Sequence, residues 1–67
     1  MGNFGERLKE MRKEEGLSQW KLAQKVGLTH TAIGHWERNE RVPNLQAVII
    51  LARYFKVTLD YIAGIEY

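Results

Sequence analysis

The sequence predicts an all-α protein, a compact bundle of five short helices that forms a single domain over residues 1–67. Apolar residues recur every three or four positions along five segments, which is the spacing of one face of an α-helix. Four of these segments follow a Ser, Thr or Asn that suits a helix N-cap, and three are followed by Gly. With 67 residues and no cysteine, we expect one small core without disulfides.

Glycines bound the first two predicted helices. The first covers residues 4–15, with Gly16 just beyond its last turn. Ser18 caps the second helix, which runs through Val26 and ends at Gly27. The side chains expected to face inward are Phe4, Leu8, Met11, Leu22, Ala23 and Val26.

The other three helices follow capping residues in the same way. Their expected ranges, each written from its cap, are Thr29–Arg38, Asn44–Phe55 and Thr58–Ala63. The residues expected to face inward along the last two helices are Leu45, Val48, Ile49, Ala52, Phe55, Leu59 and Ile62. The apolar run 47–52 has the composition of a buried strand, but the cap before it and its helical spacing favour a helix.

Residues 18–38 are the most informative segment, because they predict two short helices joined by a tight turn. The small Ala23 lets the second of these helices cross the first closely, and Gly27 suits a turn that would strain any residue with a Cβ. Ile33 and Trp36 point back into the core. This is the layout of a helix-turn-helix, which places one helix in the major groove of DNA.

The outer face of the helix after Thr29 is small and polar. At about 100° per residue, one arc of about 140° holds His30, Thr31, Gly34, His35 and Arg38. The opposite arc holds Ala32, Ile33, Trp36 and Glu37. Side chains that donate and accept hydrogen bonds suit base edges better than the Lys and Glu pairs of a solvated helix do. The alternative is a surface helix of unusual composition.

Several stretches in register resemble the Cro/CI (Xre-type) helix-turn-helix family of phage and bacterial repressors. They are GERLKEMRKEEGLSQ, LAQKVGL, AIGHWER, the segment from Pro43 through Ala52, and VTLDYI, and together they cover nearly the whole chain. The resemblance implies the lambda-repressor-like DNA-binding fold, with double-stranded DNA as the partner of the chain.

The resemblance also implies roles for individual positions. The base-reading positions are His30, Thr31 and His35. The phosphate-contacting positions are Gln19, Gln24, Thr29, Arg38, Asn39 and Arg41. Arg12 and Glu37 occupy positions that form an ion pair, which would give the acid on the inner arc a partner. The chain departs from the family at Gly34, where the side chain is often larger, and at Trp20, where it is usually polar; Trp20 fits either a sugar-phosphate contact or packing on the first helix.

Composition and residue spacing argue against several other classes of protein. The net charge of +2 is a mild excess, concentrated in and after residues 18–38. Five residues separate His30 from His35, rather than the three or four that set two ligands side by side, so we expect no metal site. Glu6, Glu10 and Glu14 form a solvated stripe among basic residues. Because the chain offers no nucleophile–base pair and little room for a pocket, we expect no enzyme, and we also expect no cofactor or small-molecule ligand. Since neither a span of about 20 apolar residues nor a secretory signal is present, we expect a cytoplasmic protein without membrane contact.

The C-terminal half leaves several large side chains that the predicted core does not use. They are Ile50, Tyr54, Tyr61, Ile65 and Tyr67. Several such residues together suggest an interface, and two-fold dimers are the commonest oligomers, so we expect a homodimer contact here. The alternative is that one or two of them cover the edge of the core.

The expected function is that of a sequence-specific DNA-binding transcriptional regulator, a repressor that binds a palindromic operator as a dimer. The alternative is a protein-interaction module that keeps the helix-turn-helix fold as a docking unit, as in an antitoxin or a coactivator. The small polar face of residues 30–38 favours DNA, because a docking helix carries apolar anchors.

Overall fold

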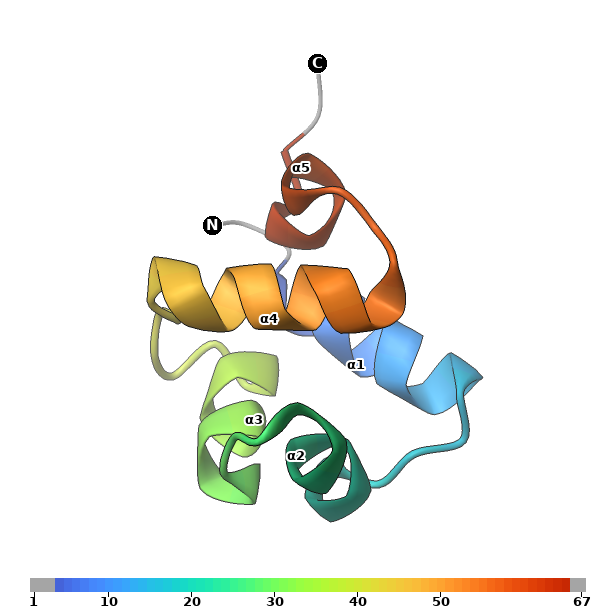
Figure 1. The fold of residues 1–67 in the computed structure, drawn as a ribbon. Helices are drawn as coiled ribbons and strands as arrows, with labels where there is room; N and C mark the ends of the chain where they lie inside the picture. Colours follow the sequence, from blue (N-terminus) through green and yellow to red (C-terminus); the bar gives the residue numbers. More distant parts are fainter. Residues whose placement is uncertain (1–3, 66–67) are drawn as a thin grey trace.

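The computed structural model describes residues 4–65, which fold into five helices in the predicted order (Figure 1). Their ranges are α1 Phe4–Glu14, α2 Gln19–Val26, α3 His30–Glu37, α4 Leu45–Phe55 and α5 Leu59–Ala63. The all-α prediction is confirmed, and each predicted end lies within one residue of the observed end. In the described part of the chain, no helix is long and apolar enough to cross a bilayer.

Side-chain caps begin α2, α3, α4 and α5. In each case the capping oxygen accepts a hydrogen bond from the backbone N–H three residues further on, at 2.8 to 3.1 Å. The four capping residues are Ser18, Thr29, Asn44 and Thr58. Each cap satisfies an N–H that the helix itself leaves unpaired, which is typically worth about 1 kcal/mol. The caps predicted from the sequence are confirmed.

Gly27 makes the turn between α2 and α3. Its backbone is left-handed, with φ 71° and ψ 27°, and its N–H donates to the carbonyl of Ala23. The N–H of Leu28 donates to the same carbonyl at 3.0 Å. A side chain at Gly27 would strain this conformation. The sharp exit from α2 brings the Thr29 cap, and therefore α3, back against α2.

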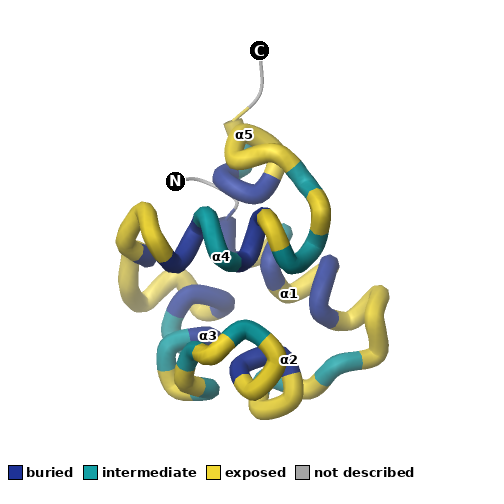
Figure 2. Tube along the Cα trace, viewed as in Figure 1, coloured by how far each residue is buried: buried dark blue, intermediate teal, exposed yellow. Residues whose placement is uncertain are grey.

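Each helix contributes one fully buried side chain to a shared core. These are Leu8, Leu22, Ile33, Leu51 and Ile62. The buried segments of the helices turn toward one another (Figure 2). Phe4 and Trp36 add an edge-to-face contact with ring centroids 6.3 Å apart. The core therefore fixes α2 and α3 against α1 and α4.

The inward faces of α4 and α5 differ from the prediction at their first residues. Leu45 and Leu59 are expected inward from their spacing, but they are 69% and 43% exposed. The buried residues of α4 are Ala47, Val48, Leu51 and Ala52, while Ile49 and Phe55 are half-buried. The prediction for Leu45 and Leu59 is wrong, because spacing identifies a face of a helix but not where the neighbouring helix ends.

The crossing of α1 and α3 requires Gly5. A Cβ at this position would meet the carbonyl oxygen of Trp36 and would lie 2.7 Å from Oδ1 of Asn39. Only a residue without a side chain allows this approach. Gly5 therefore sets how closely α3 and the loop after it lie against α1.

Candidate nucleic-acid interface

The helix-turn-helix is formed by α2 and α3, which pack directly against each other. Ala23 is buried at their crossing, and Ile33 and Trp36 are buried on the core side of α3. On the other side, Thr31 is exposed and His30 and His35 are half-buried. The two arcs predicted for α3 therefore separate into a core side and an outer side.

An ion pair between Arg12 and Glu37 joins α1 to the end of α3. Nε of Arg12 donates to Oε2 of Glu37 at 2.6 Å, and Nη2 donates to Oε1 at 2.8 Å. Nη1 of Arg12 also donates to the carbonyl of Leu17 at 2.7 Å. Both charged side chains are buried, and the hydrogen bond to Glu37 raises the pKa of Arg12. The pair implied by the family resemblance is thus a two-bond bridge that fixes α3 on α1.

Gly34 lies on the outer arc of α3 but is covered by two long side chains. A Cβ there would lie 2.9 Å from Nη1 of Arg38 and 3.3 Å from Oε1 of Gln19. Nε2 of Gln19 donates to Oε1 of Glu37 at 3.1 Å. Gln19 and Arg38, both predicted to contact phosphates, therefore lie folded over α3, and the missing side chain at Gly34 makes room for them.

Trp20 stacks on His30 at the start of α3. The ring centroids are 3.6 Å apart and the planes are inclined by 15°. The indole remains 67% exposed. The sequence left two surroundings open for Trp20, a sugar-phosphate or the first helix, and neither of them is this contact. Trp20 and His30 are ten residues apart in the chain, and only the turn between α2 and α3 brings their rings together. One of the three predicted base-reading side chains is thus held by an aromatic neighbour from α2.

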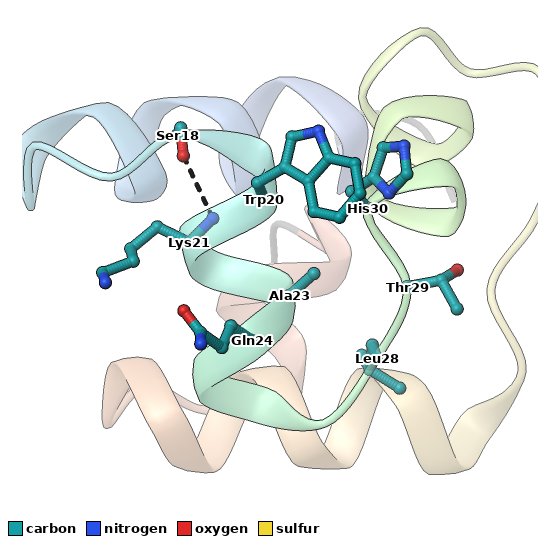
Figure 3. A pocket seen from close by; sticks show the side chains of 8 residues that line it. All are labelled: Ser18, Trp20, Lys21, Ala23, Gln24, Leu28, Thr29 and His30. Atoms are coloured by element: carbon teal, nitrogen blue, oxygen red, sulfur yellow. Dashed lines mark hydrogen bonds between the residues drawn. The ribbon is translucent and has the colours of Figure 1, made fainter.

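Two hollows lie on either side of the start of α3. A cavity of about 530 Å³ is lined by Ser18, Trp20, Lys21, Ala23, Gln24, Leu28, Thr29 and His30. Figure 3 shows the stacked rings of Trp20 and His30 beside it, with Thr29 on the connecting segment and Gln24 on α2. A second cavity of about 480 Å³ is lined by Thr29, Thr31, Ala32, His35, Trp36, Arg41, Val42, Pro43 and Asn44. Thr29 lines both hollows, so the start of α3 forms a ridge between them.

At the other end of α3, Glu40 contacts two predicted site residues. Its Oε1 lies 2.8 Å from Nδ1 of His35 and 3.1 Å from Nη2 of Arg38. The hydrogen bond from Arg38, followed by that from His35, lowers the pKa of Glu40, and the same contact with Glu40 raises the pKa of Arg38. Glu40 is not among the site residues predicted from the sequence.

The backbone turn at Asn39 places Glu40 back against the end of α3. The backbone of Asn39 is left-handed, with φ 58°, a conformation that Asn tolerates better than most residues. The N–H of Glu40 then donates to the carbonyl of His35 at 2.9 Å. The side chain of Asn39 has its Oδ1 beside Gly5 of α1. An Asn directly after a predicted helix end is the one sequence signal that points to this turn.

The sequence model of the family described as "Helix-turn-helix" matches residues 8–62. This chain belongs to the helix-turn-helix family of transcriptional regulators. The family comprises DNA-binding regulators rather than enzymes, and the Cro/CI-type (Xre-type) resemblance is confirmed.

Relatives of this helix-turn-helix chain include bacterial and phage proteins. YobD of Bacillus subtilis (strain 168), an uncharacterized HTH-type transcriptional regulator, is 37% identical over 62 residues, which are 92% of this chain and 55% of that protein. Repressor protein C2 of Salmonella phage P22 is 34% identical over 59 residues, 88% of this chain and 27% of that protein. The chain thus spans about half the length, or less, of these relatives.

A solved structure supports the same family assignment. The P22 c2 repressor in complex with a synthetic operator superposes with a TM-score of 0.85 and 32% sequence identity. The superposition covers 94% of this chain and 96% of that chain. The lambda-repressor-like fold predicted for this helix-turn-helix chain is therefore confirmed.

The residues predicted to form a dimer contact lie in different surroundings. Tyr54 and Ile50 are half-buried, and Tyr54 packs on Phe55 with ring centroids 5.0 Å apart. Tyr61 is exposed on one side, with the guanidinium of Arg7 4.3 Å from its ring centroid. Ile65 is 51% exposed. Tyr67 lies outside the described residues, and the dimer contact stays a prediction.

A further apolar hollow lies where the loop before α4 meets α5. A cavity of about 350 Å³ there is lined by Pro43, Leu45, Val48, Leu59, Asp60, Ala63 and Ile65. Its exposed leucines are the two residues that the sequence placed in the core. Leu45 and Leu59 are therefore part of a candidate interface rather than of the core.

Proposed function

We propose that this chain binds a specific site in double-stranded DNA and represses transcription there. The observation that carries the proposal is the division of α3 between core and outer side. Its apolar side chains are used in the core, and its small polar face stands between two hollows. The close superposition on the P22 c2 repressor, solved with a synthetic operator, supports the same mode of docking.

The proposed contacts fall into two groups. His30, Thr31 and His35 would meet base edges in the major groove, where each base pair presents its own pattern of donors and acceptors. Contacts to phosphates would set the register of the protein on the duplex. The residues proposed for that role are Gln19, Gln24, Thr29, Arg38, Asn39 and Arg41. On binding, Arg38 would exchange Glu40 for a phosphate.

A protein-docking function for α3 is less well supported. Among the described residues, α3 contributes no large apolar side chain that is well exposed. A helix that docks into a protein groove presents such side chains as anchors along one face. The outer face of α3 instead offers a hydroxyl and two imidazoles.

A gel-shift series tests the proposal. A site is first selected from random DNA by the purified protein, and the variants His35→Ala and Arg41→Ala are then compared on that site and on random DNA. We expect His35→Ala to weaken the selected site about 5- to 150-fold more than random DNA, because one good base contact carries about 1–3 kcal/mol of discrimination.

Arg41→Ala serves as the matched control in that series. It should weaken both DNAs alike and reduce the slope of log affinity against log salt by about 0.9, the effect of one phosphate contact. An equal loss on both DNAs for His35→Ala would remove it from the base-reading group. Selection of no site at all would contradict sequence-specific binding.

We further propose that two copies bind a palindromic operator with two-fold symmetry. The two copies of α3 would then lie about 34 Å apart, one turn of DNA. The exposed apolar residues near α5 support a contact through the C-terminal half, with the predicted Ile65 beside Leu45 and Leu59. Sedimentation over a range of concentrations, with and without DNA, tests it: a 1:1 complex on a complete site would contradict the dimer.

We also propose that the chain acts in the cytoplasm. The support comes from its relatives, which are regulators of bacteria and phage. The DNA of these organisms lies in that compartment. Fractionation of cells that express the chain would test this.

A further inference from the structure

Glu40 and His35 are joined by a hydrogen bond between a carboxylate oxygen and a ring nitrogen. The chemistry of the two groups decides which of these atoms carries the proton. Oε1 of Glu40 lies 2.8 Å from Nδ1 of His35, and the two residues are five positions apart. The left-handed Asn39 and the hydrogen bond from the N–H of Glu40 to the carbonyl of His35 hold the backbone of Glu40 in place. The contact therefore rests on a defined turn as well as on two side chains.

The carboxylate of Glu40 acts as an acceptor. Its ion pair with Arg38 at 3.1 Å favours the ionised form, and the pKa of Glu40 lies below its ordinary value. An ionised carboxylate has no proton to donate. In a neutral imidazole one ring nitrogen carries the proton and the other accepts. At a separation of 2.8 Å, the nitrogen that faces Glu40 must be the one that carries the proton.

We propose that Glu40 is a positioning residue that fixes His35 as the Nδ1–H tautomer, so that its Nε2 presents a hydrogen-bond acceptor to DNA. The described chain gives Nε2 no partner, and His35 lines the hollow beside α3. An acceptor in the major groove selects bases that present a donor there, which are cytosine through N4 and adenine through N6. Guanine presents only acceptors on that edge and is selected against.

This inference names the base class read by His35, and in that respect it rests on the proposed function. The tautomer itself does not depend on DNA. Three charged residues that follow α3 surround this contact: Glu40 contacts His35 directly, Arg38 contacts Glu40, and Arg41 lines the same hollow as His35. In the free chain, the contact from Arg38 favours the ionised form of Glu40, so Arg38 supports the tautomer indirectly.

Nitrogen NMR of the free protein tests the tautomer. The chain has two histidines, so a His30→Gln variant identifies the signals of His35. At neutral pH, the long-range proton–nitrogen correlations of His35 should show a protonated Nδ1 and an unprotonated Nε2. A protonated Nε2, alone or together with Nδ1, would overturn the proposal.

The variant Glu40→Gln tests whether Glu40 is the cause. Its amide can donate as well as accept, so Nδ1 is no longer obliged to carry the proton, and the His35 signals should move toward the Nε2–H form. Glu10→Gln removes the same charge from the exposed side of α1 and is the matched control. Unchanged His35 signals in a folded Glu40→Gln variant would overturn the proposal.

Selection from random DNA tests the consequence for recognition. The natural chain and Glu10→Gln should enrich cytosine or adenine at one position, and Glu40→Gln should lose about three- to tenfold of that preference, the effect of one hydrogen bond. An identical preference in Glu40→Gln would overturn the positioning role. If no site is enriched by any variant, the proposed function fails, while the spectra still decide the tautomer.

Discussion

Two Arg–Glu ion pairs lie near the end of α3. They have the same chemical groups but differ in burial, in geometry and in the segments that they join. Arg12 and Glu37 join α1 to α3 through two hydrogen bonds of 2.6 and 2.8 Å, and both side chains are buried. Arg38 and Glu40 lie two residues apart in the loop after α3, with one contact of 3.1 Å and about half of each side chain exposed.

The difference shows what burial does to an ion pair. Neither charge of Arg12–Glu37 can return to water without unfolding, so the loss of one partner leaves the other buried and uncompensated. Water and salt compete with Arg38–Glu40 at every moment, and such pairs add little to stability. The buried pair therefore maintains the position of α3, whereas the exposed pair is free to exchange partners at the surface that we propose for DNA.

The largest expected effect comes from breaking the buried pair. Arg12→Ala should lower the free energy of unfolding by about 3–5 kcal/mol, because it leaves the buried charge of Glu37 with only the hydrogen bond from Gln19 and removes the donor to the carbonyl of Leu17. Urea unfolding followed by circular dichroism measures this. Arg38→Ala is the control and should unfold at the same urea concentration as the natural chain. Equal losses in the two variants would contradict the comparison.

Gly34→Ala tests whether the exposed pair can move. A Cβ at position 34 meets only the ends of the Arg38 and Gln19 side chains, so these should shift at little cost. Because Ala is favoured over Gly within a helix, the free energy of unfolding should rise by about 0.5–1 kcal/mol. Thermal unfolding measures the gain. A loss of stability would mean that Arg38 is fixed over Gly34 and that the pair is less free than the comparison holds.

Gly5→Ala is the contrasting control for that substitution. Its Cβ would meet the backbone carbonyl of Trp36 rather than a flexible side chain. We expect it to destabilise the chain while Gly34→Ala stabilises it. The same sign for both would mean that contact with backbone and contact with side-chain ends are not the deciding difference.

The smallest expected effect concerns the acid dependence of the exposed pair. Because the pKa of Glu40 is lower in the folded chain than its ordinary value of 4.5, the unfolded chain takes up the proton first. The stability that Glu40 contributes is therefore present above that ordinary value and is lost as the pH falls through the lowered pKa. Glu40→Gln should flatten this part of the acid unfolding curve, whereas Glu10→Gln should leave it unchanged.

Local signals predicted most of the architecture. The caps Ser18 and Thr29 and the turn residue Gly27 act within three or four residues of their own positions, so the sequence contains everything that decides them. Periodicity likewise identified Ile33 and Trp36 as core residues of α3. It failed for Leu45 and Leu59, where exposure depends on how far a neighbouring helix extends.

The sequence by itself determined five helices, a tight turn and a small polar face on the helix that follows it, because hydrogen bonds and spacing within a few residues specify these features. Only the tertiary structure decided that Trp20 stacks on His30, that Arg38 folds over Gly34 and that Glu40 returns to His35. These contacts depend on the crossing of α2 with α3 and on the left-handed turn at Asn39, and no local pattern encodes where two separate segments come together.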